Sequence, residues 1–371
     1  MATLQELLHP QVIFDSITSR IKAPNDVLQR FFGFQMGGPN VKRIRGRAGV
    51  YDIFDFVREV GSASMPMTPA TRIAAKPIAQ QPVHLLRKNE AIPLYYDQLH
   101  HMRQLGKPQV TVDKGGAQYI EEQERRLKQQ FGAFREFVTA SLLRGNVYFT
   151  ASGEELQPSF SSSGATLNIN QQIPANNLNQ LNGTILISWD NTAAATIFKD
   201  VLAINALSLN QSGWPIKHVW VEETVWTNVT ANTDMRARAG TSNVTFENFT
   251  GLGKEGPDDK SPDAFDAVLR PLPGIMWHIY SGGVELNGTF TKLLPTTGAS
   301  FMPEPSESWV TALQGTEYVA ENETNPPAER DTPYFWPWYI RDPAKVELVG
   351  LDLFMCVARV PKCLFDATVV F

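Results

Sequence analysis

One amphipathic segment constrains the fold of this chain more than any other. It covers residues 119–145, with the sequence YIEEQERRLKQQFGAFREFVTASLLRG. Its apolar residues recur at helical spacing and form a single stripe: Ile120, Leu127, Phe131, Phe134, Val138 and Leu142. Such a helix is about 40 Å long at roughly 1.5 Å per residue, and it offers only one narrow apolar face. The pattern therefore predicts a long spine rather than an ordinary core helix.

The polar residues and the end of the segment support the same prediction. Three pairs of opposite charge stand four residues apart: Glu121 with Arg125, Glu122 with Arg126, and Glu124 with Lys128. Each pair is expected to stabilise the helix by roughly 0.2–0.5 kcal/mol. Gly145 follows the last apolar residue and is a suitable C-cap, so the helix should end there.

The stretch VREVGSASMPMTPATRIAAKPIAQQP, residues 57–82, fits neither a helix nor a strand. It carries four prolines and no clean alternation. A loop of this length is uncommon inside a compact domain, because ordering each residue costs roughly 1–2 kcal/mol of backbone entropy. Either the stretch is disordered, or it gains its contacts from a surface outside its own domain.

Strand-like sequence flanks this stretch on both sides. VYDIFDFV (50–57) alternates, and VHLLRKN (83–89) predicts a returning strand with Val83, Leu85 and Arg87 on one face. Residues 50–87 are therefore expected to form one long two-stranded hairpin that extends away from the rest of the chain. Because a lone hairpin is marginally stable in water, this one needs a partner surface.

A basic run, VKRIRGR at 41–47, precedes the first of these strands. Lys42, Arg43, Arg45 and Arg47 could contact phosphate. We favour an ion-pairing strand that docks on an acidic neighbour.

A second unit of mixed α/β type begins near residue 189. Ile197, Val201, Ile204 and Leu207 predict a helix capped by Asn191 or Thr192 and ended by Gly213. Strands are expected at 218–222 and 276–282, a short helix at 223–232, a polar insertion near 240–272, and β structure in the closing segment 342–371.

Composition excludes several classes of protein. The formal charge of -5 argues against a dedicated nucleic-acid or membrane-surface binder. No apolar run reaches about 18 residues, so no membrane partner is expected. The two cysteines, Cys356 and Cys363, have no metal-site spacing, and the first residues show no signal-sequence pattern. We expect synthesis in a reducing, intracellular compartment.

The sequence shows no constellation that would support catalysis. The six histidines are scattered, and no CxxC, HExxH, GxSxG or phosphate-loop pattern occurs. Asp258, Asp259, Asp263 and Asp266 could gather around a cation, but they lack EF-hand spacing and a solvated loop is favoured. We therefore expect no enzyme, no catalytic residue, no bound metal and no cofactor.

The aromatic run YFWPWYI at 334–340 could form a stacking platform for sugars or bases. Pro333 and Pro337 favour a packed or subunit-facing segment instead. Together with the tryptophans, several Asn-X-Ser/Thr sequons keep one alternative open, a glycan-binding β-rich protein.

Other segments carry a resemblance to a known family. They are RFFGF (30–34), SASMPMTPATRIAAKP in the proline-rich stretch, LLRKNEAIPL (85–94), the helix sequence at 121–149, ISWDN (187–191), IYSGG (279–283), LLPTTG (293–298) and PWYIRDP (337–343). In their order the chain resembles the Hong Kong 97 fold of tailed-phage major capsid proteins. Within that group it is most similar to the lambda-type major capsid protein E family.

The resemblance implies an α+β fold with named parts. These are an N-terminal arm (1–47), an extended β-hairpin loop or E-loop (48–88), a peripheral domain (89–188) with the spine helix at about 115–145, an axial α/β domain (189–340) and closing C-terminal strands (341–371). It implies a major capsid protein that self-assembles, as hexamers and pentamers, into an icosahedral head shell.

The resemblance also implies partners and a location. Double-stranded DNA would be packaged inside without specific contacts, and portal, scaffold and decoration proteins would bind the shell. The protein would be part of the virion and be made in the host cytoplasm. An encapsulin-like nanocompartment shell is the alternative that keeps the fold.

The candidate site is a subunit interface formed by the E-loop and the arm. Met65, Met67 and Ile73 offer apolar contacts, and the methionines adapt readily to a partner surface. Positive charge comes from Arg45, Arg47, Arg58, Arg72 and Lys76. We expect these side chains to contact the adjacent subunit.

Overall fold

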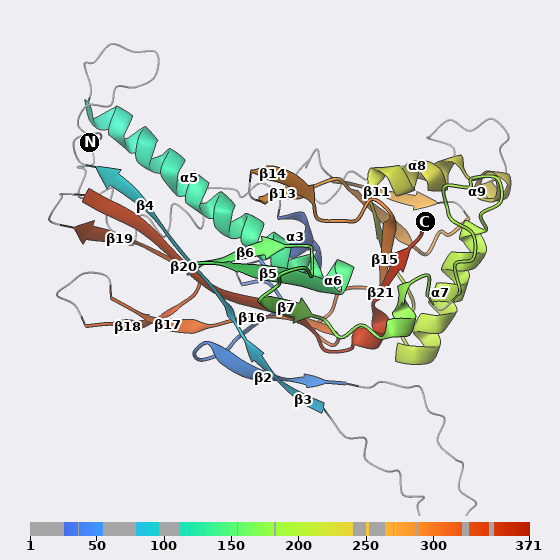
Figure 1. Cartoon of the computed structure of the whole chain (residues 1–371), viewed down its shortest axis with the longest axis horizontal. Helices are drawn as coiled ribbons and strands as arrows, with labels where there is room; N and C mark the ends of the chain where they lie inside the picture. The colour runs from blue at the N-terminus through green and yellow to red at the C-terminus, as the bar shows by residue number, and fades with distance from the viewer. Residues whose placement is uncertain are drawn as a thin grey trace, which may run out of the picture.

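The computed structural model describes residues 26–35, 37–54, 79–95, 112–153, 155–181, 183–239, 250–251, 264–269, 271–286, 288–320, 326–340 and 345–371. The molecule is elongated and of α+β type, with a long helix and its sheet at one end and a second sheet with three helices at the other (Figure 1). Among the described helices, none combines the length and the apolar character needed to cross a membrane.

The predicted spine helix is confirmed. Helix α5 (Val112–Thr139) continues almost directly into α6 (Ser141–Arg144), and Gly145 follows with a positive φ of 74°. Leu127, Phe131 and Val138 are buried, as the stripe requires. Of the residues in the predicted charge pairs, Arg125 contacts Glu122, three residues away, at 3.4 Å.

A five-stranded sheet lies under α5. Its strands are β1 (Val41–Arg43), β4 (Leu86–Tyr95), β16 (Val310–Gln314), β19 (Tyr334–Ile340) and β20 (Lys345–Ala358). The long strand β20 is central, because it pairs antiparallel with β4 on one side and with β19 and β16 on the other. Phe131 of α5 packs with Leu94 and Leu348 of this sheet in one apolar cluster.

A seven-stranded sheet forms the other end, in the order β10-β11-β12-β9-β15-β21-β8. Its strands are β8 (Leu178–Asn179), β9 (His218–Val221), β10 (Thr250–Gly251), β11 (Ala264–Leu269), β12 (Met276–Tyr280), β15 (Gly298–Met302) and β21 (Phe365–Thr368). The strands predicted at 218–222 and 276–282 are thereby confirmed.

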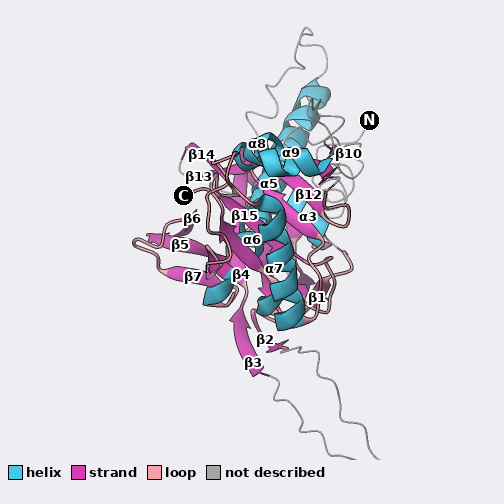
Figure 2. Cartoon of the chain, turned by 90° about the vertical axis from the view of Figure 1, so that its right-hand side faces the viewer, coloured by secondary structure: helices cyan, strands magenta, loops and turns pink. Residues whose placement is uncertain are grey.

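Three helices accompany this sheet, and Figure 2 shows α7 in front of it. They are α7 (Ile197–Ser212), α8 (Glu223–Ala231) and α9 (Thr233–Ala239). Gly213 ends α7 as predicted, with φ 78°. The predicted start was wrong: Thr196 is the N-cap residue, and the Asn191 side chain accepts from Ala194 N in a preceding turn instead.

The two faces of this sheet pack against different elements, because side chains alternate along each strand. Val219, Trp277 and Phe301 face the cluster that contains Ile204 of α7. Trp220 and Tyr280 face the opposite cluster, which includes Phe32 of the short helix α3 (Val27–Phe32).

The remaining strands form small sheets. They are β2 (Ala48–Ile53) with β3 (Ala79–His84), β5 (Asn146–Ser152) between β6 (Glu155–Ser159) and β7 (Leu167–Asn170), β13 (Gly283–Leu286) with β14 (Thr289–Lys292), and β17 (Thr316–Val319) with β18 (Ala328–Asp331). Short 3-10 helices cover Ala175–Asn177 and Pro361–Cys363. The returning strand predicted at 83–89 is divided between β3 and β4, so Val83 and Leu85 are buried while Arg87 is exposed.

Candidate functional site

The predicted interface residues divide into two groups. Arg58, Met65, Met67, Arg72, Ile73 and Lys76 lie outside the described residues, so their contacts remain a prediction. Arg45 and Arg47 are described, at the base of the β2–β3 hairpin. Asp258, Asp259 and Asp263 of the acidic cluster also lie outside the described residues.

The β2–β3 hairpin projects from the body of the molecule (Figure 1). Its two strands are antiparallel from Ala48 opposite His84 to Ile53 opposite Ala79. Residues 55–78 are therefore attached at two neighbouring points. Phe54 holds the stem to the body, since its N–H donates to Arg359 O at 2.8 Å and its ring lies 4.6 Å from the Arg359 guanidinium.

The basic run at 41–47 contacts acidic residues of the β17–β18 hairpin. Arg43 Nη1 lies 2.6 Å from Asp331 Oδ2, and Arg45 Nη2 lies 3.1 Å from Glu329 Oε2. The predicted ion-pairing strand on an acidic neighbour is confirmed, and the neighbour belongs to the same chain. Contacts of Arg45 and Arg47 with a second subunit stay a prediction.

These ion pairs differ in burial. Arg45 is 81% exposed, and such pairs contribute little because water screens them. Glu329 raises the pKa of Arg45 through a hydrogen bond and its charge. The Glu317 side chain is only 9% exposed and binds both Arg47 and Arg87, the latter at 3.1 Å. Glu317 is therefore the anchor between the hairpin stem and β17.

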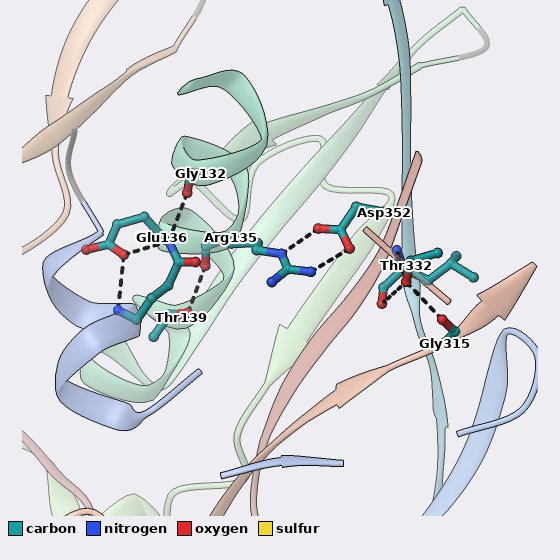
Figure 3. A network of polar contacts seen from close by, with 9 residues as sticks. Gly132, Arg135, Glu136, Thr139, Gly315, Thr332 and Asp352 are labelled. Carbon is teal, nitrogen blue, oxygen red and sulfur yellow. Dashed lines mark hydrogen bonds and ion pairs between the residues drawn. The ribbon is translucent and has the colours of Figure 1, made fainter. Parts of the chain in front are cut away.

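A buried ion pair joins α5 to the sheet (Figure 3). Arg135 Nε lies 2.6 Å from Asp352 Oδ2 and Nη2 lies 2.8 Å from Oδ1, a bidentate arrangement. The side chains are 7% and 0% exposed. Nearby, Thr332 Oγ1 donates to Gly315 O at 2.9 Å and accepts from Leu353 N at 3.2 Å. These bonds connect β20 with the loops that flank it.

Glu136, the next residue of α5, holds helix α3. Its carboxylate accepts from Leu28 N at 2.7 Å, from Gln29 N at 3.2 Å and from Gln29 Nε2 at 3.1 Å, and Gln29 Nε2 also donates to Gly132 O (Figure 3). Tyr280 Oη lies 3.4 Å from the same carboxylate. Burial raises the pKa of Glu136 to about 8, although the hydrogen bonds from Leu28 and Gln29 oppose the shift.

A row of four titratable side chains crosses the seven-stranded sheet below α3. Glu304 Oε2 lies 2.7 Å from His218 Nε2, His218 Nδ1 lies 2.8 Å from His278 Nε2, and His278 Nδ1 lies 2.5 Å from Asp266 Oδ1. Phe31 of α3 packs edge-on against both imidazoles, at 4.9 and 5.0 Å between ring centres. Sequence spacing gave no sign of this row, because the pairing of β9, β12 and β11 brings its members together.

None of these groups forms a metal centre. Among the described residues, no three His, Cys, Asp or Glu side chains gather in a way that could hold a metal ion. Cys356 and Cys363 are free and buried. Burial raises the pKa of the Cys356 thiol to about 12 and that of Cys363 well above its ordinary value, so neither is a reactive thiolate.

The aromatic run 334–340 is strand β19, and its middle part is packed as predicted, whereas Tyr339 is 38% exposed. Phe335 and Trp336 are 3% and 7% exposed and contribute to two apolar clusters of the five-stranded sheet. They cannot serve as an open stacking platform.

Large apolar side chains remain exposed on elements that lie far apart in the molecule. They are Val50 on β2, Leu186 in the loop after β8, Phe290 on β14 and Tyr318 on β17, each more than 60% exposed. Scattered exposed apolar residues are common, but these stand on projecting hairpins and loops. The arrangement suits several modest contacts better than one deep binding cleft.

Comparison with known proteins identifies one family and solved structures of similar fold. A sequence model of the family described as phage major capsid protein E matches residues 14–369. The chain is similar in structure to a prophage protein from Escherichia coli CFT073 assigned as a capsid protein, with TM-score 0.60, 13% identity and coverage of 98% of this chain and 99% of that chain. It is also similar to a phage-related protein from Bordetella bronchiseptica RB50, with TM-score 0.50, 10% identity and coverage of 97% and 96%. No curated protein sequence matches.

Proposed function

The chain belongs to the phage major capsid protein E family, and we infer from this that its copies build the head shell around the DNA genome of a tailed phage. The observation that carries this conclusion is the family match over residues 14–369, nearly the whole chain. The fold agrees, since the Hong Kong 97 type expected from the sequence is shared with the prophage capsid relative. The protein is a structural component of the virion.

The shell is proposed to be icosahedral, with hexamers and pentamers of this chain. A closed lattice is stable when each subunit makes many modest contacts at once, because the contacts reinforce one another. The exposed apolar side chains on separate hairpins support this arrangement. The buried Arg135–Asp352 pair and the Glu136 contacts support a subunit body that stays rigid while its projections contact neighbours.

The named parts of the fold are proposed as follows. Residues 1–47 form the arm and residues 48–88 the E-loop, with Arg58, Met65, Met67, Arg72, Ile73 and Lys76 as contacts to an adjacent subunit. The unit around α5 is the peripheral domain, and the seven-stranded sheet with α7, α8 and α9 is the axial domain. The proposed boundaries are 89–188, 189–340 and 341–371, with one amendment. Strands β16, β19 and β20 pair in the sheet under α5, so we assign these three strands to the peripheral domain.

The further partners are also proposals. Double-stranded DNA inside the shell would be held without specific contacts, in keeping with the formal charge of -5, since a mildly negative wall does not grip a polyanion. Portal, scaffold and decoration proteins would bind the assembled shell. Synthesis would take place in the host cytoplasm.

Electron microscopy of the purified protein after expression in a bacterium tests this function. We expect closed shells of uniform size. A protein that stays monomeric at all concentrations, and that binds oligosaccharides instead, would support the glycan-binding alternative and overturn the proposal.

A phage head and an encapsulin-like compartment share the fold, so a second experiment is needed to distinguish them. Particles purified from a bacterial host in which the phage has been induced to multiply should carry tails and protect DNA from nuclease. Tailless particles that enclose a protein cargo would support the encapsulin-like alternative.

A further inference from the structure

The row Glu304–His218–His278–Asp266 contains more contacts than two neutral histidines can supply with hydrogens. Each of its three contacts, at 2.5 to 2.8 Å, requires one hydrogen between the heavy atoms. Two neutral imidazoles carry two N–H groups, and two ionised carboxylates carry none. The complete row therefore holds one added proton.

The burial of the side chains indicates which of the three contacts is lost when that proton leaves. The Asp266 and His278 side chains are 16% and 7% exposed, so leaving this carboxylate without a donor would be costly. With two hydrogens, His278 Nδ1–H donates to Asp266, and His218 Nδ1–H donates to His278 Nε2. The Nε2 lone pair of His218 then faces the Glu304 carboxylate, and the two repel each other.

Glu304 can leave this position easily, because its side chain is 75% exposed. Without the added proton, the Glu304 carboxylate is stabilised more by hydration than by a position that faces the lone pair of His218. With the proton, the same contact becomes a charge-assisted hydrogen bond, which is stronger than a neutral one. We propose that Glu304 is a proton-dependent latch, which binds His218 when the histidine pair takes up a third proton and turns to solvent when that proton leaves.

The surroundings of the pair indicate the direction of the pH dependence. The charged groups that act on His218 are His278 from β12, Asp266 from β11 and Glu304 itself. From α3 the pair is faced by the uncharged ring of Phe31, while Arg30 and Asp26 of that segment bind each other. Burial lowers the pKa of His218 below its ordinary value of 6.5, with the hydrogen bond to Glu304 opposing the shift. The latch should close on acidification.

The segment that carries Glu304 connects the two sheets. It runs from the end of β15 in the seven-stranded sheet to the start of β16 in the five-stranded sheet. Trp309 Nε1 donates to Glu304 O at 2.8 Å, and Glu307 binds Lys42 at 2.6 Å. An open latch leaves this connection held by the Trp309 bond to the Glu304 backbone oxygen and by the contacts of Glu307, but removes its side-chain link to β9. The inference goes beyond shell formation, since it rests only on contacts within one subunit and concerns how its two halves are held.

Hydrogen exchange of the amides of Trp309 and Val310, which both donate to Ser306 O, tests the proposal. The comparison uses unassembled full-length protein and the variant Glu304→Gln, whose amide N–H can donate to neutral His218 without an added proton. The ratio of rates between the two proteins cancels the intrinsic effect of pH. At about pH 8 the wild type should exchange about three- to tenfold faster than the variant, and at about pH 5.5 the two should agree within about twofold.

Glu307→Gln is the matched control on the same segment. Lys42 lowers the pKa of Glu307, so this carboxylate stays ionised over the tested range and its substitution should change exchange by the same factor at both pH values. A pH-independent ratio for Glu304→Gln as well would overturn the latch. Nitrogen-15 NMR of the histidine rings is a second, independent test. Neutral His218 should carry its hydrogen on Nδ1, and an Nε2–H tautomer at about pH 8 would contradict the proposal.

Discussion

Arg135 and Asp352 form a buried bidentate ion pair that joins the spine helix to the middle of β20. Removing one partner leaves an uncompensated charge in the core. We expect Asp352→Ala to lower the free energy of unfolding by about 3–5 kcal/mol. Urea denaturation of the unassembled subunit measures this change.

The control for this prediction is Arg125→Ala, which removes an exposed helical pair with Glu122 and should change stability by less than about 0.5 kcal/mol. Replacing both buried partners together, Arg135→Met with Asp352→Leu, should restore most of the loss. Similar losses for the buried and the exposed substitution would show that the pair does not anchor the helix.

Glu136 should make the stability of the subunit depend on pH. Because its folded pKa of about 8 lies above the ordinary 4.5, the folded chain binds its proton more tightly than the unfolded chain does. Its contribution is fully present below about pH 4.5 and is lost as pH rises to about 8. Glu136→Gln should therefore gain on the wild type across this window when unfolding is followed at several pH values. A difference that stays constant with pH would contradict the assignment, and the exposed Glu122→Gln serves as control.

Gly350 of β20 has no room for a side chain. A Cβ there would lie 2.8 Å from Phe131 and 3.0 Å from Phe335, both packed ring atoms. We expect Gly350→Ala to destabilise the subunit by about 1–3 kcal/mol, as overpacking does. Gly274→Ala is the matched control, since nothing lies within 4 Å of its Cβ position. Equal melting temperatures for the two variants would show that α5 can shift away from β20.

Deleting residues 61–76 should abolish assembly without unfolding the subunit. The ends of residues 55–78 are attached at the paired residues Ile53 and Ala79, so a shortened connection can still close the hairpin. Circular dichroism and sedimentation should report a folded, unassembled protein. Normal shells in electron micrographs would refute the predicted role of the loop.

A milder variant distinguishes the effect of losing side-chain contacts from the effect of shortening the loop. Serine at Met65, Met67 and Ile73 keeps the loop but removes its apolar side chains, and it should slow assembly at least tenfold if those residues contact a neighbour. Light scattering follows the rate. Serine at Ala63 and Ala70 is a control on the same loop, and it should leave assembly unchanged.

The spine helix could be predicted from sequence because its information is local. Six apolar residues at helical spacing and one terminal glycine specified it. The role of Glu136 could not be predicted in this way, since it appears in the sequence as one more polar residue between apolar ones. Its role became clear only when α3 brought the N–H groups of Leu28 and Gln29 to it.

Non-local pairing explains what sequence patterns could not show. His218 and His278 are separated by 60 residues and meet because β9 and β12 are parallel neighbours. Likewise, the acidic neighbour of Arg45 was correctly expected, but its position on β18 depends on how β1 pairs with β16. Pattern and composition indicate which elements form, whereas the register between distant strands decides which side chains meet.

The late position of β20 in the chain has a consequence during synthesis. Helix α5 emerges from the ribosome long before the strand that covers Leu127 and Phe131, and β15 likewise waits for β21. Neither half of the nascent chain can bury its apolar face until the last strands have been translated. Chains with such long-range strand pairing fold slowly and expose apolar surface in the meantime, so this subunit is most prone to aggregation before its last strands are in place.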